Sequence, residues 1–342
     1  MGGLINIITK DPTGRGGVNI DMNLPNLGEL TADLGAQLKA DRATGLLGVS
    51  AYNYWTRHDI NHDNFTDVAQ KRRLSLFSKW ELDRNSKLPA SLAVRLLGET
   101  RWGGEMHWHP AYKGGDEVYG ELIATRRAEL IGRYGIHRNL NLEYSYNYHW
   151  QDSYYGTTWY KGQQHTTFAQ LRWEKSLGRH NLLAGIPFRY LWYNDNTSAT
   201  AAKPAGNAPS RQSMAALYLQ DEMKWNPKLT TLLGMRYEYT NLQGGIVAQG
   251  IALKWSPAEH HTLRLSGGNG FRIVNLFTED HAALSGFREI VIKNALKPER
   301  SWNVNLNYTG DVHLNGGVLG WDASAFFTRF TNKIIPNYDS DP

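Results

Sequence analysis

The chain has 342 residues, and among them are 12 Trp, 18 Tyr, 10 Phe and 34 Gly. So many aromatic residues argue against disorder, and together with the glycines they favour strands and turns over helices. No stretch approaches the roughly 18 consecutive apolar residues of a membrane-spanning helix, which excludes a helical membrane protein. The absence of cysteine excludes disulfide frameworks, thiolate zinc sites and thiol catalysis. The net charge of +5 is spread along the chain, without the dense basic block of a nucleic-acid-binding tail.

The first residues, MGGLINIITKDP, have neither the basic region nor the cleavage site of a secretory signal peptide. We therefore expect that Met1 is not the start of the natural gene product.

Strict alternation of apolar and polar residues recurs along the chain and predicts strands. It is clearest in residues 140–150 (LNLEYSYNYHW), and it returns at residues 92–99, 251–255 and 302–308. In the first of these segments the side chains expected to face outward are Leu142, Tyr144 and Tyr146, and those on the opposite face are Asn141, Glu143 and Ser145. The predicted strands run roughly 9–12 residues, about the length that crosses a bilayer at a tilt.

The connections between these strands alternate between short and long. Tight turns are predicted at residues 41–44, 83–88, 137–140, 177–181 and 225–229, and long polar loops at residues 57–70, 101–120, 151–165, 194–212 and 271–301. An up-and-down meander has this pattern when its two ends face different surroundings, as in transmembrane β-barrels. We expect the loops at 101–120 and 271–301 to lie at the same end, because each follows an odd-numbered strand.

Aromatic residues gather near the predicted strand ends, as in the interfacial girdles of membrane barrels. They are Tyr52, Tyr54, Trp55, Trp102, Tyr148, Trp150, Tyr190, Trp192 and Tyr193. The alternative is a soluble all-β sandwich or propeller, but no self-similar repeat of about 40–50 residues is present. The predicted fold is all-β: a transmembrane, antiparallel, up-and-down β-barrel.

Residues 2–12 (GGLINIITKDP) resemble the last strand of the plug domain of TonB-dependent outer-membrane receptors. The segments NGFRIVNLFTEDHAAL and LKPERSWNVNLNY, and residues 116–155, are similar to barrel segments of the Bacteroidetes branch of that family, a branch of siderophore and cobalamin receptors. The resemblance covers essentially the whole chain.

The resemblance implies that residues 1–15 are the C-terminal remnant of a plug domain and that residues 16–342 form a partial barrel. About 15 strands are predicted here, whereas complete members of the family have about 22. An open edge leaves backbone groups unpaired in lipid. We therefore expect a fragment: an incomplete, curved sheet whose first strand, near 17–25, and last strand, near 320–330, do not pair fully, with residues 2–12 outside the barrel wall.

By the same resemblance, the protein is an outer-membrane receptor for active transport of a metal chelate, either a siderophore, cobalamin or haem. Its implied partners are that ligand, the TonB complex acting through the rest of the plug, a surface lipoprotein and outer-membrane lipid, but no nucleic acid. No cofactor and no enzymatic activity are implied, and no GxSxG or HExxH motif is present. The alternative is a barrel that works without TonB, as a passive porin or an enzyme; porins have no plug-like tail.

The candidate ligand-binding residues lie in the predicted long loops. In the sequence MHWHP, His107 and His109 flank Trp108; in a strand-like segment the two imidazoles share a face, where they could contact a metal, a haem or a corrin. Tyr155 and Trp159 belong to the aromatic loop at 151–165.

Asp280 and His281 follow a possible N-cap, Thr278, in TEDHAAL, which predicts a short helix at residues 278–284. A cation could bind there, although capping and loop packing explain the same residues. Arg272 is expected in a structural ion pair inside the lumen, by resemblance. We interpret His58, His62, His260 and His261 as solvated, and no resident metal site is predicted.

Overall fold

The protein is described by a computed structural model that covers residues 17–25, 28–197, 200, 206–273 and 297–335. Within these ranges the chain folds into one 15-stranded sheet, and the 3-10 turn η1 (Pro110–Tyr112) lies between two of its strands. The strands are β1 (Val18–Asn23), β2 (Glu29–Ala40), β3 (Ala43–Tyr54), β4 (Gln70–Leu82), β5 (Ala90–Gly104), β6 (Gly120–His137), β7 (Leu140–Tyr155), β8 (Thr158–Leu177), β9 (His180–Asp195), β10 (Ser210–Asn226), β11 (Leu229–Thr240), β12 (Gly244–Ala258), β13 (His261–Arg272), β14 (Glu299–Leu314) and β15 (Gly317–Asn332).

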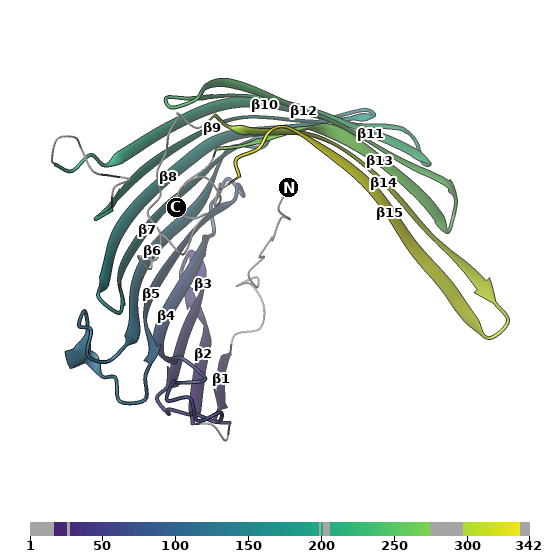
Figure 1. Cartoon of the computed structure of the whole chain (residues 1–342). Coiled ribbons are helices and arrows are strands. Elements are labelled where there is room, and N and C mark those ends of the chain that lie inside the picture. The colour runs from purple at the N-terminus through teal and green to yellow at the C-terminus, as the bar shows by residue number, and fades with distance from the viewer. Residues whose placement is uncertain (1–16, 26–27, 198–199, 201–205, 274–296, 336–342) are drawn as a thin grey trace.

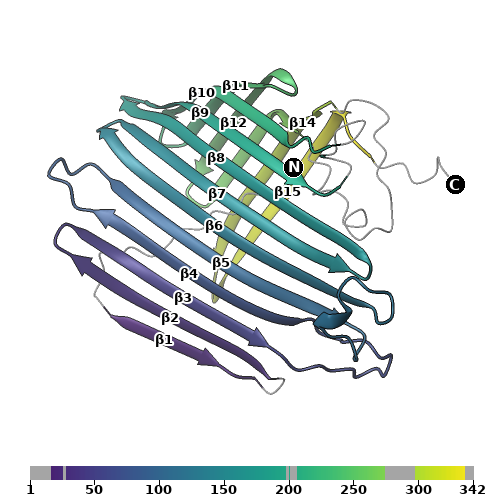
Figure 2. The same ribbon diagram turned by 90° about the vertical axis from the view of Figure 1, so that its left-hand side faces the viewer.

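Every strand pairs antiparallel with the next one in the chain, in the order β1 to β15. Figure 2 shows the long strands lying side by side, and Figure 1 shows the sheet bent into a wide arc with β1 and β15 at its two edges. In the part of the chain that the structure describes, β1 and β15 do not pair with each other. The predicted unclosed, up-and-down sheet is therefore confirmed, while residues 2–12 lie outside the described residues.

The two ends of the sheet differ as the sequence predicted. At one end, the short-turn end, the connections that follow even-numbered strands are two residues long, except residues 83–89. At the other, the long-loop end, residues 55–69, 105–119 and 196–209 connect the strands. Because β5 and β13 run in the same direction, the connections that follow them leave the sheet at the same end, as predicted; residues 274–296 lie outside the described ranges.

One predicted loop is a hairpin. The sequence analysis placed a long loop at 151–165, but β7 continues to Tyr155 and β8 begins at Thr158, so only two residues connect them. Gly156 makes the turn with a φ of 55°, a conformation that glycine adopts at no steric cost. The polar composition of this hairpin concealed strands of 16 and 20 residues, well above the expected 9–12.

The two faces of the sheet have opposite chemistry. Residues opposite each other in an antiparallel pair share a face, and the register places Leu142 opposite Tyr134 and Leu171, and Tyr144 opposite Gly132 and Ala169. The intervening residues Glu143 and Asn141 lie on the other face, where they contact Arg172 and Arg133. The predicted register of this segment is confirmed.

Large apolar side chains are exposed on the face that carries Leu142 and Tyr144, as the exposed fractions of Ile186 (59%) and Phe327 (67%) illustrate. Most of the buried side chains of the strands belong to the polar face, among them Asn141, Glu238 and Glu299. Side chains converge on the concave side of a bent sheet, so we assign the polar face to the concave side and the apolar face to the convex side. This distribution is the reverse of a water-soluble sheet and fits a wall that faces lipid.

Two rows of aromatic residues border the apolar face. The row near the short-turn end contains Trp80, Tyr134, Trp173, Trp225, Trp255 and Trp321, and the row near the long-loop end contains Trp102, Tyr148, Trp150, Tyr190 and Trp192. At about 3.3 Å per residue, the outward row of β5 from Leu92 to Trp102 covers about 33 Å of strand, or about 23 Å of membrane at a 45° tilt.

The predicted girdle is only partly correct. Tyr52, Tyr54 and Tyr193 alternate in phase with the polar residues and therefore lie on the concave face, and Trp55 lies beyond the end of β3. Among the described residues, no helix has the length and apolar character that crossing a bilayer requires.

Candidate functional site

The concave face near the long-loop end is basic and aromatic over β3 to β6; we call this region the inner wall. On β3, the ring of Tyr52 lies between two cations of β4, with Lys71 Nζ 4.6 Å and Arg73 Cζ 5.6 Å from the ring centroid. The register produces this arrangement, since Tyr52 pairs with Arg73 and Tyr54 with Lys71. Each cation is held near the ring by electrostatic attraction to the negative ring face.

A charged network continues the inner wall onto β5 and β6. The Glu129 carboxylate forms ion pairs with Arg127, whose Nε is 2.7 Å away, and with Arg95 at 3.4 Å. It also accepts a hydrogen bond of 3.0 Å from the Asn147 side-chain amide. Lys71 lies 4.0 Å from Glu99. Arginine and lysine outnumber the carboxylates here, so this part of the concave face attracts anions.

Beside the inner wall, β8 and β9 contribute a buried tyrosine pair. The hydroxyls of Tyr160 and Tyr193 are 3.0 Å apart, and Tyr193 donates a hydrogen bond of 2.6 Å to Asp195. Asp195 also accepts from Thr200 Oγ1 at 2.7 Å, which holds the start of the following connection. Gly162 lies under Tyr160, where a β-carbon would be only 2.5 Å from the phenolic oxygen. This cluster therefore has a fixed geometry.

The MHWHP segment is not a strand, in contrast to the sequence analysis. It forms a turn followed by η1, so His107 and His109 do not share a strand face. Both side chains are exposed, and His109 Nδ1 accepts from the amide of Ala111 at 3.3 Å and thereby caps η1. Proline at the start of a helical turn and a side-chain acceptor before it favour this local structure over a strand.

Trp108 is 2% exposed and anchors the loop of residues 105–119. Its indole lies against Gly120, where a β-carbon would come within 2.3 Å of the ring, so only glycine fits. The loop is also tied to the 55–69 connection by the hydrogen bonds from Arg57 Nη1 to the carbonyl of Met106 and from the amide of Met106 to the carbonyl of Asn64. The contacts of Trp108 are thus with the protein itself.

The other predicted site residues are separated by the sheet. Tyr155 lies on the concave face opposite Glu121, whereas Trp159 lies on the convex side, where its Nε1 donates to Asp152 at 2.8 Å. Tyr119, immediately before β6, donates a hydrogen bond of 2.8 Å to Glu121, and burial, followed by this carboxylate, raises the pKa of Tyr119 to about 12. Asp280, His281 and the predicted helix at 278–284 lie outside the described residues.

Two further predictions about charged residues have different outcomes. Arg272 donates to Glu299 at 2.7 Å on the concave face, and Glu299 is only 6% exposed, so the predicted structural ion pair is confirmed. His260 and His261 are not simply solvated, which corrects the sequence analysis. His260 contacts Asp311 at 3.1 Å, and His261 contacts the hydroxyl of Tyr308 at 2.8 Å.

The sequence analysis missed the inner wall and the tyrosine pair. Tyr52, Arg73, Arg127, Tyr160 and Tyr193 belong to four different hairpins, and only the register brings them to one face. The phase of the alternation could have indicated this shared face, because each of these five residues occupies one of the polar positions of its strand.

Comparison with known proteins identifies the family. Residues 14–342 match the family model described as "TonB dependent receptor-like, beta-barrel". The chain belongs to the TonB-dependent receptors. As a member of that family it is an outer-membrane protein, with its short-turn end in the periplasm and its long-loop end outside the cell.

Solved structures of TonB-dependent receptors share the fold at low sequence identity. The siderophore receptor PirA from Pseudomonas aeruginosa is 14% identical, with a TM-score of 0.64 over 97% of this chain and 59% of that chain. The FrpB iron transporter from Neisseria meningitidis is 13% identical, with a TM-score of 0.69 over 96% of this chain and 56% of that chain. The ferric-catecholate import receptor Fiu from E. coli K12 is 12% identical, with a TM-score of 0.65 over 98% of this chain and 61% of that chain.

The chain thus spans somewhat more than half the length of these receptors. A search of the curated protein sequences found no match.

Replacing Trp108 by Ala will release the extracellular loop of residues 105–119. Removing a buried indole costs about 3–5 kcal/mol of local packing, so trypsin will cleave faster after Lys113, which is exposed. His107→Ala, at an exposed neighbour, is the matched control and will leave cleavage unchanged. Equal cleavage rates in both variants would contradict an anchoring role for Trp108.

Proposed function

We propose that this chain forms the barrel wall of a receptor that binds iron chelates outside the cell and imports them, with a siderophore as the ligand class. The observation that carries the proposal is the family match over residues 14–342 in a chain whose concave, extracellular inner wall is basic and aromatic. The similar proteins described as a siderophore receptor, an iron transporter and a ferric-catecholate import receptor support it.

The inner wall suits an anionic, aromatic ligand. Ferric catecholates carry net negative charge and present aromatic rings, so Lys71, Arg73 and Arg127 would supply charge complementarity and Tyr52 a ring surface. Cobalamin lacks this charge. A haem would require an imidazole ligand, for which the exposed His107 and His109 are the candidates. The inner wall therefore favours a siderophore.

The finer parts of the proposal concern ligand contacts and partners. Within the predicted site, Trp108, Tyr155, Trp159, Asp280 and His281 are proposed as rim residues near the extracellular mouth. Import would be driven by the TonB complex through a plug, of which residues 1–15 are the proposed remnant and residues 16–342 the barrel. The same proposal includes a surface lipoprotein as a further partner and membership of the Bacteroidetes branch. It also includes transport without a catalytic step.

Uptake in a receptor-deficient strain tests this function. The gene, in its natural context, is expressed in a strain that lacks its own chelate receptors, and uptake of radiolabelled iron is measured from a ferric catecholate, a ferric hydroxamate and haem, with labelled cobalamin alongside. We expect uptake of a ferric siderophore that disappears when TonB is deleted. Uptake that persists without TonB would instead indicate a passive porin, and cobalamin or haem uptake alone would replace the ligand class.

The double variant His107→Ala/His109→Ala tests the histidine loop separately. If the loop supplies imidazole ligands, uptake of haem or of another metal ligand will fall by about tenfold or more, because a lost metal–ligand bond is not replaced by alanine. His62→Ala, at an exposed histidine of the neighbouring 55–69 connection, is the control. Unchanged uptake in the double variant would leave both residues with only the capping and surface roles seen in the fold.

A further inference from the structure

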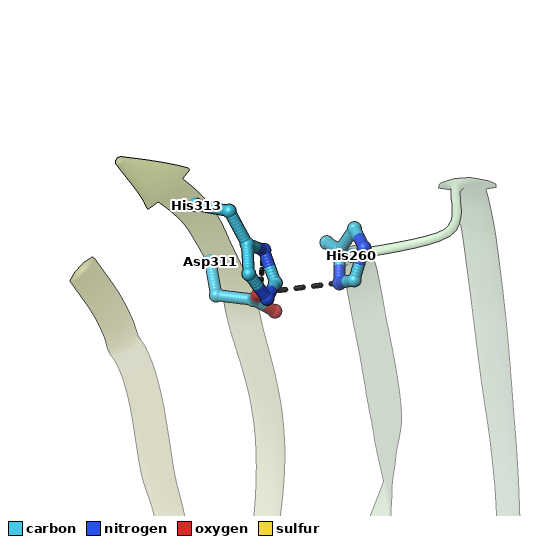
Figure 3. Close-up of side chains that lie close together, drawn as sticks. All are labelled: His260, Asp311 and His313. Atoms are coloured by element: carbon cyan, nitrogen blue, oxygen red, sulfur yellow. Dashed lines mark ion pairs between the residues drawn. The ribbon is translucent and has the colours of Figure 1, made fainter. Parts of the chain in front are cut away.

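Three side chains at the periplasmic end form a compact group of metal-ligand type. His260 Nδ1 is 3.1 Å and His313 Nδ1 is 3.5 Å from the same oxygen, Oδ2 of Asp311. Figure 3 shows the three side chains close together, with dashed lines marking the contacts of the Asp311 carboxylate with the two imidazoles. In the described ranges, this is the one group of three or more potential ligands whose donor atoms all lie within 4.8 Å of one another.

The fold places these residues together in a defined way. Asp311 and His313 are two apart on β14 and therefore project from the same, concave face. His260 lies in the turn between β12 and β13, and its carbonyl accepts a hydrogen bond of 3.2 Å from the amide of Asp311. The next residue, His261, pairs with Gly310 on the convex face and contacts Tyr308, so it is not part of the group.

The two histidine–carboxylate separations match those of ligand pairs around one ion. Two donors bound to a tetrahedral zinc at about 2.0–2.1 Å are about 3.3 Å apart, which lies between the two distances measured here. Two imidazoles and a carboxylate suit Zn²⁺, Ni²⁺ or Cu²⁺ rather than Ca²⁺ or Mg²⁺. All three side chains are accessible, with side-chain exposures of 47%, 33% and 63% for His260, Asp311 and His313, so an ion can enter.

We propose that His260, Asp311 and His313 bind a divalent transition metal at the periplasmic rim, with water completing the coordination. The ion links the β12–β13 turn to β14 and so fastens three neighbouring strands of the wall. This site is at the opposite end of the sheet from the inner wall and does not depend on which chelate the receptor imports.

A second histidine–carboxylate contact in the same molecule provides a matched control. His180 Nδ1 lies 2.7 Å from Asp221 Oδ2, also near the periplasmic end, but no third ligand of this kind joins them within the described residues. If such pairs alone bound metal, His180 would contribute as much as His260 or His313.

The test uses Zn²⁺ and the receptor extracted from outer membranes in detergent. Equilibrium dialysis followed by elemental analysis will give about one tightly bound Zn²⁺ per chain, and His260→Gln, Asp311→Asn and His313→Gln will each weaken binding by about tenfold or more. His180→Gln will leave the affinity unchanged. Heat-dependent migration in gels checks that every variant is folded; His313→Gln, at the most exposed of the three, is the decisive variant if another fails to fold.

Copper supplies a second measurement. Cu²⁺ added at one equivalent will show electron-paramagnetic-resonance hyperfine coupling to two imidazole nitrogens in the wild type and to one in His313→Gln. If no stoichiometric Zn²⁺ is found, or if His180→Gln weakens binding as much as His313→Gln, the three residues form only an ion-pair cluster without a bound metal. Either result overturns the proposal and leaves the transport function untouched.

Discussion

Replacing Leu96 by Arg will lower the free energy of unfolding of the barrel in lipid by about 2–4 kcal/mol, the cost of placing arginine near the middle of a lipid-facing strand. Leu96 lies on β5, pairs with Leu76 and Ala128, and is 45% exposed on the convex face. The free energy is measured by urea titration of the protein in phospholipid vesicles, followed by tryptophan fluorescence.

The adjacent leucine makes an unusually close control. Leu97 is one residue further along β5 and therefore faces the lumen, where it pairs with Ser75 and Arg127. Leu97→Arg places the same new charge in the same strand at nearly the same depth, but among water and polar groups, so we expect a loss below about 1 kcal/mol. If Leu97→Arg were the more harmful change, the assignment of the apolar face to lipid would be reversed.

The fold was predictable because alternation and loop length report independent features. Alternation fixes the face of each residue, as the register around Leu142 and Tyr144 confirmed. Loop length fixes the direction of the meander, so the connections after β5 and β13 were correctly placed at one end. Errors arose where these two signals conflict: at 151–165 the residues are polar enough for a loop, yet alternation continues to Tyr155.

The site was less predictable because its residues are brought together by strand pairing. His107 and His109 attracted attention as neighbours in sequence, but proline at 110 and the cap on η1 turn the segment away from strand geometry. By contrast, His260 is more than 50 positions from His313, and only the β13–β14 register and the 3.2 Å backbone bond to Asp311 bring them into contact. A single sequence gives no direct measure of such pairing.

Replacing Arg73 by Gln will weaken binding of an anionic ferric siderophore by about tenfold to a hundredfold, the range expected when one charge-assisted hydrogen bond to a ligand is lost. Arg73 lies on the concave face of β4, over the ring of Tyr52 and opposite Glu99. Its removal lowers the positive potential of the inner wall, so the association rate will fall as well, and more at low salt than at high salt.

The preceding residue is the control for this change. Arg72 is exposed on the convex face, 5.6 Å from the ring centroid of Trp102, at the level of the outer aromatic row. Arg72→Gln removes the same charge at the same height of the barrel, but the wall separates it from the lumen. Binding is measured by quenching of tryptophan fluorescence with the purified receptor at two salt concentrations. A loss of affinity in Arg72→Gln equal to that in Arg73→Gln would mean that the ligand does not contact the concave face, whereas a loss confined to Arg73→Gln, and reduced at high salt, places the anionic ligand against the inner wall.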